Sequence, residues 1–182
     1  MLLDTPVCDF GWKAPDFTLR DPDGNAFKMS EYIGEKGLLI AFICNHCPYV
    51  KAIGDRLAAD TRELMAAGIN VLAVMSNDYR DYAEDSPQNM KRFSAQYGFD
   101  FPYLVDEDQS VGKAYGAVCT PDFFGLNKDG VLQYRGRLDN KHMQGGDDRV
   151  RELVAAMMQI AQSGEGPKEQ VPSMGCSIKW SS

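Results

Sequence analysis

The sequence predicts an α/β fold in which helices cover both faces of a central mixed β-sheet. Two continuous apolar runs of strand length, at residues 38–43 and 69–75, are typical of strands buried on both faces. A segment with helical periodicity joins them, and strands that alternate with helices imply right-handed crossovers. A Cys-x-x-Cys motif follows the first run directly, so the predicted strand leads into the predicted helix at a chemically distinctive point.

The first half of the chain contains a predicted hairpin and a predicted strand–helix–strand unit. Residues 16–19 and 26–29 flank a turn at 21–24 whose proline and glycine preset or permit the backbone angles of a tight turn, which predicts an N-terminal hairpin. Between the two apolar runs, apolar residues recur at helical spacing over 50–65, and Gly68 stands where a helix commonly ends. This helix returns the chain to the second run.

The second half continues with a predicted helix that starts at Ser86 and Pro87, an N-cap followed by a proline at the first helical position, and stops at Gly98. The same reasoning predicts a short strand at 101–105, strands at 122–126 and 131–135 joined by a turn, and a final helix at 150–161. Arg135 and Arg137 alternate along the second of these strands, so we expect both side chains on one solvated face.

Length and composition favour one domain. A chain of 182 residues with 44% hydrophobic content can bury a sizeable core. We expect a single domain over 1–182, with a core at about 14–163 and a C-terminal extension at 164–182 that has no periodic pattern and is wrapped or mobile.

The net charge of −7 at pH 7 argues against nucleic acid or an anionic membrane as a main partner. No run approaches the roughly 18 apolar residues that a membrane span needs, and the first residues do not resemble a signal peptide, so we expect a cytoplasmic protein. The five cysteines are an odd number and cannot all pair within the chain. In a reducing compartment this indicates reactive thiols rather than structural disulfides.

The motif Cys44-Asn45-His46-Cys47-Pro48 carries the main functional prediction. A cysteine at the start of a helix lies near exposed backbone N–H groups, which favour the thiolate that attacks disulfides. The spacing lets a second thiol resolve the mixed disulfide, so we expect Cys44 to attack and Cys47 to resolve. His46 can add a positive charge or a hydrogen bond that stabilises the Cys44 thiolate.

Half of a zinc site is the structural alternative for a Cys-x-x-Cys pair. No second Cys-x-x-Cys occurs, and His142 is the only histidine outside the motif, where we expect a surface loop. The strand-to-helix context favours redox chemistry over metal binding, and no metal or other cofactor is predicted beyond a redox-active Cys44–Cys47 disulfide.

Three segments resemble the thioredoxin superfamily, and more closely its peroxiredoxin-like branch, the alkyl hydroperoxide reductase and thiol-specific antioxidant family. They are Ala14-Pro15-Asp16-Phe17-Thr18-Leu19 with its turn, the stretch 38–48, and Thr120-Pro121 with the following 123–130. The resemblance implies a thioredoxin-like three-layer fold. It also implies a cis peptide bond at Thr120-Pro121 against the active cysteines, where both residues shape a substrate groove.

The sequence departs from the family pattern at two places. Peroxiredoxins resemble Pro-x-x-x-Thr-x-x-Cys around the peroxide-reducing cysteine, and the matching positions here are Ile40, Cys44 and Cys47. A second cysteine thus replaces the threonine that helps to hold peroxide, which favours disulfide exchange. Many thioredoxins keep a buried acid where this chain has Leu38, so proton transfer needs another route, such as water or His46.

Two other cysteines are candidate redox thiols. Cys119 lies two residues before Pro121, and the superfamily geometry implies that it is near Cys44; a small apolar residue at a strand end is the alternative. Cys176 lies in the C-terminal extension, which can bring it to the active site or to a neighbouring subunit, or can simply dock Ile178 and Trp180 onto the body.

The first functional hypothesis is therefore a thiol–disulfide oxidoreductase that acts on protein or small-thiol partners. A thiol peroxidase in which Cys47 or Cys44 becomes a sulfenic acid is the second. A chaperone that carries copper or zinc on Cys44, Cys47 and His46 or His142 is the third. The sequence specifies no oligomeric state.

Overall fold

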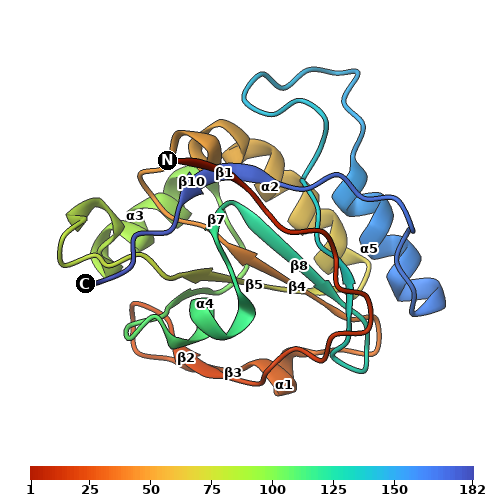
Figure 1. Ribbon diagram of the computed structural model, residues 1–182, viewed down its shortest axis with the longest axis horizontal. Coiled ribbons are helices and arrows are strands. Elements are labelled where there is room, and N and C mark those ends of the chain that lie inside the picture. Colours follow the sequence, from red (N-terminus) through yellow and green to blue (C-terminus); the bar gives the residue numbers. More distant parts are fainter.

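A computed structural model, which describes all residues 1–182, places the two apolar runs side by side in a seven-stranded mixed sheet (Figure 1). The strand order is β3-β2-β6-β5-β4-β8-β9, with β4 parallel to β5 and antiparallel to β8. The strands are β2 (Thr18–Arg20), β3 (Ala26–Lys28), β4 (Leu38–Phe42), β5 (Asn70–Met75), β6 (Tyr103–Val105), β8 (Asp122–Leu126) and β9 (Leu132–Tyr134). The predicted hairpin is confirmed, because β2 and β3 pair antiparallel.

The central strand β4 is buried along its whole length because each face of the sheet has its own apolar cluster. Side chains alternate across a strand, so Leu39 and Ala41 enter one cluster, whereas Leu38, Ile40 and Phe42 enter the other. This explains why the run reads as continuously apolar in the sequence.

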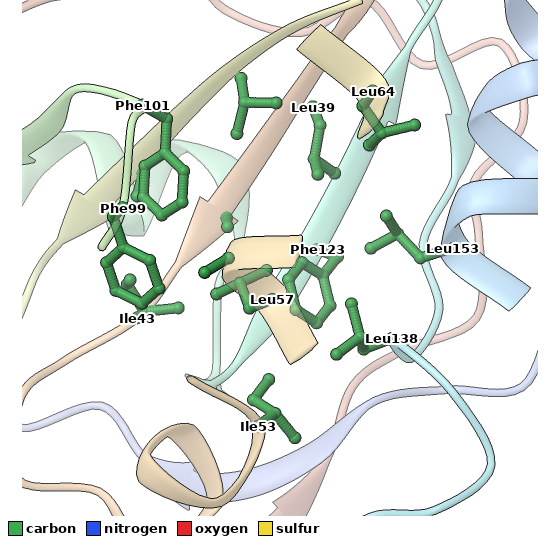
Figure 2. Packing of buried hydrophobic residues seen from close by; sticks show 14 of the residues in the cluster. Leu39, Ile43, Ile53, Leu57, Leu64, Phe99, Phe101, Phe123, Leu138 and Leu153 are labelled. Carbon is green, nitrogen blue, oxygen red and sulfur yellow. The ribbon is translucent and has the colours of Figure 1, made fainter. Parts of the chain in front are cut away.

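Three long helices cover the first face and two short ones the second (Figure 1). The first set is α2 (Pro48–Ala66), α3 (Pro87–Tyr97) and α5 (Glu152–Ser163), and the second is α1 (Met29–Tyr32) and α4 (Ser110–Tyr115). Figure 2 shows side chains of α2, β8 and α5, among them Leu57, Phe123 and Leu153, meeting in one cluster. The predicted α/β architecture is confirmed.

The helix ends follow their sequence signals in part. The Oγ of Ser86 accepts a hydrogen bond from the backbone N–H of Asn89 at 3.3 Å, and Gly98 ends α3 with a φ of 69°. The predicted start of the final helix at Val150 is wrong: α5 begins at Glu152, and Val150 is 57% exposed. Helix α4 was not predicted, since it has six residues and is too short for a periodic pattern.

A second, three-stranded sheet joins both ends of the chain next to the motif (Figure 1). It contains β1 (Leu2–Asp4), β10 (Met174–Ser177) and β7 (Cys119–Thr120), in the antiparallel order β1-β10-β7. The C-terminal extension at 164–182, which was expected to be wrapped or mobile, wraps around the body. Strands β1 and β10 were not predicted from the sequence.

After β10 the chain runs back to the loop that follows β5. The backbone N–H of Lys179 donates to Oδ1 of Asn77, and its carbonyl accepts from Asp78, each at 2.8 Å. The ring of Trp180 then lies 5.7 Å from the Nζ of Lys113 in α4. No helix in the structure combines the length and the apolar character that a bilayer crossing requires.

Candidate active site

The motif lies where β4 leads into α2, as the sequence predicts. Cys44 follows the strand by two residues, Cys47 is the N-cap of α2, and Pro48 is its first residue. The cis peptide bond between Thr120 and Pro121 is confirmed. The structure brings these residues together: the Cys44 Sγ lies 3.4 Å from the Thr120 Oγ1, and the Cys47 Sγ lies 3.4 Å from the Thr120 carbonyl oxygen.

The negative charge of the thiol pair is favoured on Cys47. A hydrogen bond from the Cys44 thiol lowers the pKa of Cys47 to about 4 against the opposing effect of burial, helped by the thiol and backbone of Cys176 and by the backbone N–H of Val50. Hydrogen bonding to Cys47, burial and the charge of Asp85 raise the pKa of Cys44 well above its ordinary value.

The attack by Cys44 that the sequence predicts therefore stays a prediction, and the environment of the pair favours the thiolate of Cys47. Cys47 is the N-cap of α2 and lies near the backbone N–H of Val50, whereas the charge of Asp85 disfavours a thiolate on Cys44.

Asp85 is the main site residue that the sequence analysis missed. It is fully buried in a short 3₁₀ helix (Ala83–Asp85). Its carboxylate accepts hydrogen bonds from the backbone N–H of Asn45 at 2.7 Å, the Nδ1 of His46 at 2.5 Å and the Nδ2 of Asn77 at 3.0 Å. Burial works to raise the pKa of Asp85, but these hydrogen bonds outweigh it and hold the pKa below its ordinary value. The carboxylate thus fixes the loop between the two cysteines.

His46 pairs with this carboxylate rather than with a cysteine. The hydrogen bond to Asp85 raises the pKa of His46, which favours the imidazolium. The ring also stacks on Tyr82, with centroids 5.9 Å apart and planes 12° apart. His46 acts on the thiols through its charge, because the imidazolium and a Cys47 thiolate attract each other.

Both polar atoms of the Asn45 side-chain amide form hydrogen bonds. Its Oδ1 accepts a hydrogen bond from the buried Tyr103 hydroxyl at 2.9 Å, and its Nδ2 donates to the carbonyl oxygen of Glu84 at 3.0 Å. Tyr103 was also missed by the sequence analysis. No local sequence signal marks Tyr103 or Asp85, because they reach the motif from 58 and 39–40 residues away.

The three remaining cysteines lie in different surroundings, and all five cysteines are free thiols. Cys119 is fully buried, with its Sγ 3.9 Å from the Pro121 carbonyl oxygen, and burial raises its pKa to about 12. Cys176 is half-buried on β10, packs against the cluster that contains Cys44 and Cys47, and lowers the pKa of Cys47. Cys8 is half-buried beside Arg135 and Gln170.

A buried ion pair lies behind Pro121. The Nη2 of Arg135 is 2.8 Å from the Oδ2 of the fully buried Asp122, and its guanidinium covers the ring of Phe124 at 4.4 Å. The prediction that Arg135 and Arg137 share one solvated face is wrong for Arg135, which is buried. Strand β9 already ends at Tyr134, and Arg137 is partly exposed and pairs with Glu152 at 2.7 Å. His142 lies in an exposed loop, as predicted.

A metal alternative has a specific set of residues. The ligand atoms of Cys44, His46 and Asp85 all lie within 4.8 Å of one another. Sulfur, imidazole and carboxylate are ligands that zinc accepts. However, the Nδ1 of His46 is already bonded to Asp85, so binding a metal through both atoms requires that this hydrogen bond break.

Comparison with known proteins decides the family. A model of the AhpC/TSA family matches residues 10–135. The chain belongs to the AhpC/TSA family. Peroxiredoxin Bcp of Escherichia coli is 30% identical over 120 residues, which cover 65% of this chain and 70% of Bcp. The resemblance to the peroxiredoxin-like branch is thereby confirmed, and the protein is an oxidoreductase enzyme.

Comparison with solved structures extends this likeness to nearly the whole length of this chain. A hypothetical protein from Sinorhizobium meliloti is 38% identical, with a TM-score of 0.92 and 98% of each chain covered. A secreted disulfide oxidoreductase of Mycobacterium tuberculosis, homologous to E. coli DsbE, shares the fold with a TM-score of 0.59 over 78% of this chain and 94% of its own, at 19% identity. The thioredoxin-like fold is therefore established.

Proposed function

We propose that this AhpC/TSA protein is a thiol–disulfide oxidoreductase whose Cys44 and Cys47 cycle between a dithiol and a disulfide. The observation that carries the proposal is that both sulfurs, at the start of α2, lie 3.4 Å from atoms of Thr120, whose peptide bond to Pro121 is cis. Its substrates are disulfides of proteins or of small thiols. The redox-active disulfide is the only cofactor that this chemistry needs.

The lowered pKa of Cys47 supports an order of steps that is the reverse of the one expected from the sequence. The Cys47 thiolate attacks one sulfur of the substrate disulfide, so that a mixed disulfide forms and one substrate thiolate leaves. Cys44 then attacks the Cys47 sulfur and gives its proton to the second substrate thiolate as that group leaves. The substrate gains two electrons, and the protein ends with a Cys44–Cys47 disulfide.

The surrounding residues have positioning roles in this proposal. The Thr120 hydroxyl, 3.4 Å from the Cys44 Sγ, orients that thiol toward Cys47. Pro121 shapes the adjoining backbone, and Asn45, His46 and Pro48 fix the loop and the helix start. Cys119 packs as a small apolar residue, since burial disfavours its thiolate.

Peroxide reduction is the second candidate, and one observation favours it. Cys47 is the cysteine with the lowered pKa, and it occupies the position of the peroxide-reducing cysteine in the family pattern. Its thiolate would attack the terminal peroxide oxygen, releasing an alcohol or water and leaving a sulfenic acid. Cys44 would then condense with that sulfenic acid and release water. The relative Bcp is named a peroxiredoxin, but here a cysteine replaces the family threonine.

One experiment separates these candidates. The reduced protein is titrated in glutathione redox buffers, and trapped thiols are mapped by mass spectrometry, for wild type, Cys47→Ser and the control Cys8→Ser. We expect a two-electron transition confined to Cys44 and Cys47, which Cys47→Ser abolishes and Cys8→Ser retains.

The same samples are then mixed with hydrogen peroxide. Consumption of peroxide at a rate that exceeds reduction of oxidised glutathione or a protein disulfide would favour the peroxidase. Absence of any two-electron transition, with stoichiometric zinc or copper in the purified protein, would favour the metal alternative.

The cytoplasm is the compartment that we propose, because a reactive dithiol and an odd number of cysteines suit a reducing environment. Rapid alkylation of thiols in intact cells should then find Cys44 and Cys47 largely reduced. A pair that is fully oxidised in unstressed cells would contradict this location.

A further inference from the structure

A third thiol lies against the pair. Strand β10 pairs with β7 so that Cys176 is opposite Thr120, the residue whose hydroxyl and carbonyl face Cys44 and Cys47. Cys176 also packs against the buried cluster that contains both Cys44 and Cys47. The C-terminal strand therefore contributes a sulfur to the site.

The close approach of β10 is built into its sequence. Gly175 has no room for a side chain, because a Cβ there would lie 1.8 Å from the Thr120 carbonyl oxygen. The Oγ of Ser173 donates to the Pro121 carbonyl oxygen at 2.7 Å. On its outer side β10 is paired with β1, where Leu2 is opposite Cys176. Residues on both sides of Cys176 thus hold it beside Cys47.

Solvent reaches the three thiols unequally. Cys44 and Cys47 are 1% and 0% exposed, whereas Cys176 is half-buried. Exchange requires that the attacking thiolate reach the disulfide sulfur. Cys176 is therefore the most accessible of the three thiols, whereas an external thiol reaches Cys44 or Cys47 only if covering residues move aside.

We propose that Cys176 is the solvent-facing thiol of a three-cysteine relay, through which a small external thiol reduces the buried Cys44–Cys47 disulfide. This inference rests on the proposed function. The Cys176 thiolate attacks the Cys47 sulfur, a Cys47–Cys176 disulfide forms, and Cys44 leaves and takes up the proton that Cys176 lost. This internal step changes no net oxidation state.

The external thiol then completes the reduction. Its thiolate attacks the Cys176 sulfur, a mixed disulfide forms there, and Cys47 leaves as a thiolate. A second external thiolate attacks the mixed disulfide and releases the external disulfide together with the Cys176 thiolate, which takes up a proton. Two external thiols are oxidised and the protein gains two electrons. Cys47 suits the role of leaving group, because its pKa is lowered and thiols of low pKa leave faster.

The test uses the full chain and glutathione as the external thiol. Oxidised wild type, Cys176→Ser and Cys8→Ser are mixed with reduced glutathione, quenched with an alkylating agent and mapped by mass spectrometry. Cys8 is a matched control, since burial likewise raises the pKa of both Cys8 and Cys176 to about 11, but Cys8 contacts Arg135 rather than Cys47. We expect glutathione bound transiently to Cys176 in wild type and at least tenfold slower reduction of Cys176→Ser, with Cys8→Ser unchanged.

A second variant tests the proposed disulfide directly. Cys44→Ser, oxidised with one equivalent of diamide, should yield a Cys47–Cys176 cross-linked peptide. Reduction of Cys176→Ser at the wild-type rate, or absence of that peptide while wild type still forms its Cys44–Cys47 disulfide, would overturn the relay alone. A wild type that never forms the Cys44–Cys47 disulfide would overturn the proposed function itself.

Discussion

The two sheets of this protein are stabilised in different ways. The seven-stranded sheet has an apolar cluster on each face and helices over both, so its stability comes from burial of apolar surface. The three-stranded sheet consists of short strands from the two ends of the chain and from the Cys119–Thr120 segment, and it is held by backbone pairing and close approach.

The candidate site lies where these sheets meet. Cys44 and Cys47 come from the end of the large sheet and the start of α2, whereas Thr120 and Cys176 come from the small sheet. Substitutions in the two sheets should separate stability from chemistry.

Phe123→Ala should have the largest effect, because Phe123 is fully buried in the cluster under α2 (Figure 2). Loss of the ring from a packed core costs about 3–5 kcal/mol of the free energy of unfolding. Urea denaturation measures this loss, and Phe123→Leu should cost less because it leaves a smaller cavity. A free energy of unfolding that falls by less than about 1 kcal/mol, as it does for a surface substitution, would contradict the burial of Phe123.

Gly175→Ala is the corresponding change in the small sheet. The new Cβ would meet the Thr120 carbonyl oxygen at 1.8 Å, so β10 must move away, at a cost of about 3 kcal/mol for the local structure. Hydrogen exchange should accelerate in β1 and β10 but not in β4. Gly116→Ala is a control, since no atom lies within 4 Å of its added Cβ and only the positive φ of 65° is strained. Equal acceleration in β4 would show that the two sheets do not open separately.

Asp85→Asn tests the large-sheet side of the site through its pH dependence. Loss of the charged hydrogen bond should cost about 1.5 kcal/mol. The pKa of His46 is raised in the folded protein, so its contribution is complete below the unfolded value of 6.5 and is lost as the pH rises through the folded pKa. The pKa of Asp85 is lowered, so its contribution is present above the unfolded value of 3.8 and is lost as the pH falls through the folded pKa.

The difference in stability between wild type and Asp85→Asn should therefore be largest between about pH 4 and pH 6.5 and shrink at higher pH. Thermal unfolding across this pH range measures it. The exposed Asp108→Asn, whose carboxylate bonds only to the nearby Ser110, is the control. A difference that grows above pH 7 would contradict the His46–Asp85 ion pair.

Ser173→Ala should have the smallest effect. It removes the hydrogen bond to the Pro121 carbonyl oxygen, a loss of about 1 kcal/mol. The control is Ser177→Ala, within β10, which removes only a contact with the Lys179 side chain and should change stability less. Chemical denaturation of both variants provides the comparison, and a larger loss in Ser177→Ala would be inconsistent with docking of β10 through Ser173.

The contrast between the sheets also explains how far the sequence alone could go. Strands β4 and β5 and helix α2 were predicted because their signals are local: apolar runs, helical spacing and Pro48 at the helix start. The Cys-x-x-Cys spacing located the site for the same reason. Strands β1 and β10 have three and four residues, and they pair with each other and with β7 from distant parts of the chain, so no local pattern marks them.

The electrostatics of the site required the three-dimensional structure. Asp85 and Tyr103 contact the motif from distant positions. Asp85 pairs with His46, and its charge adds to the hydrogen bond with Cys47 and to burial in raising the pKa of Cys44. Arg135 was expected on a solvated face because the predicted strand included residue 135, whereas β9 ends at Tyr134. A buried carboxylate two residues after Thr120, namely Asp122, binds it instead.

The position of Trp180 provides an optical signal for the state of the C-terminal segment. It follows β10, is 39% exposed and lies beside Lys113, whereas the only other tryptophan, Trp12, packs edge-on against Tyr115 with ring centroids 5.4 Å apart. In a Trp12→Phe variant, the emission of Trp180 would report by its wavelength whether the segment is docked or released. Stopped-flow fluorescence of that variant can follow, in real time, how the strand that carries Cys176 moves as the thiols are oxidised and reduced.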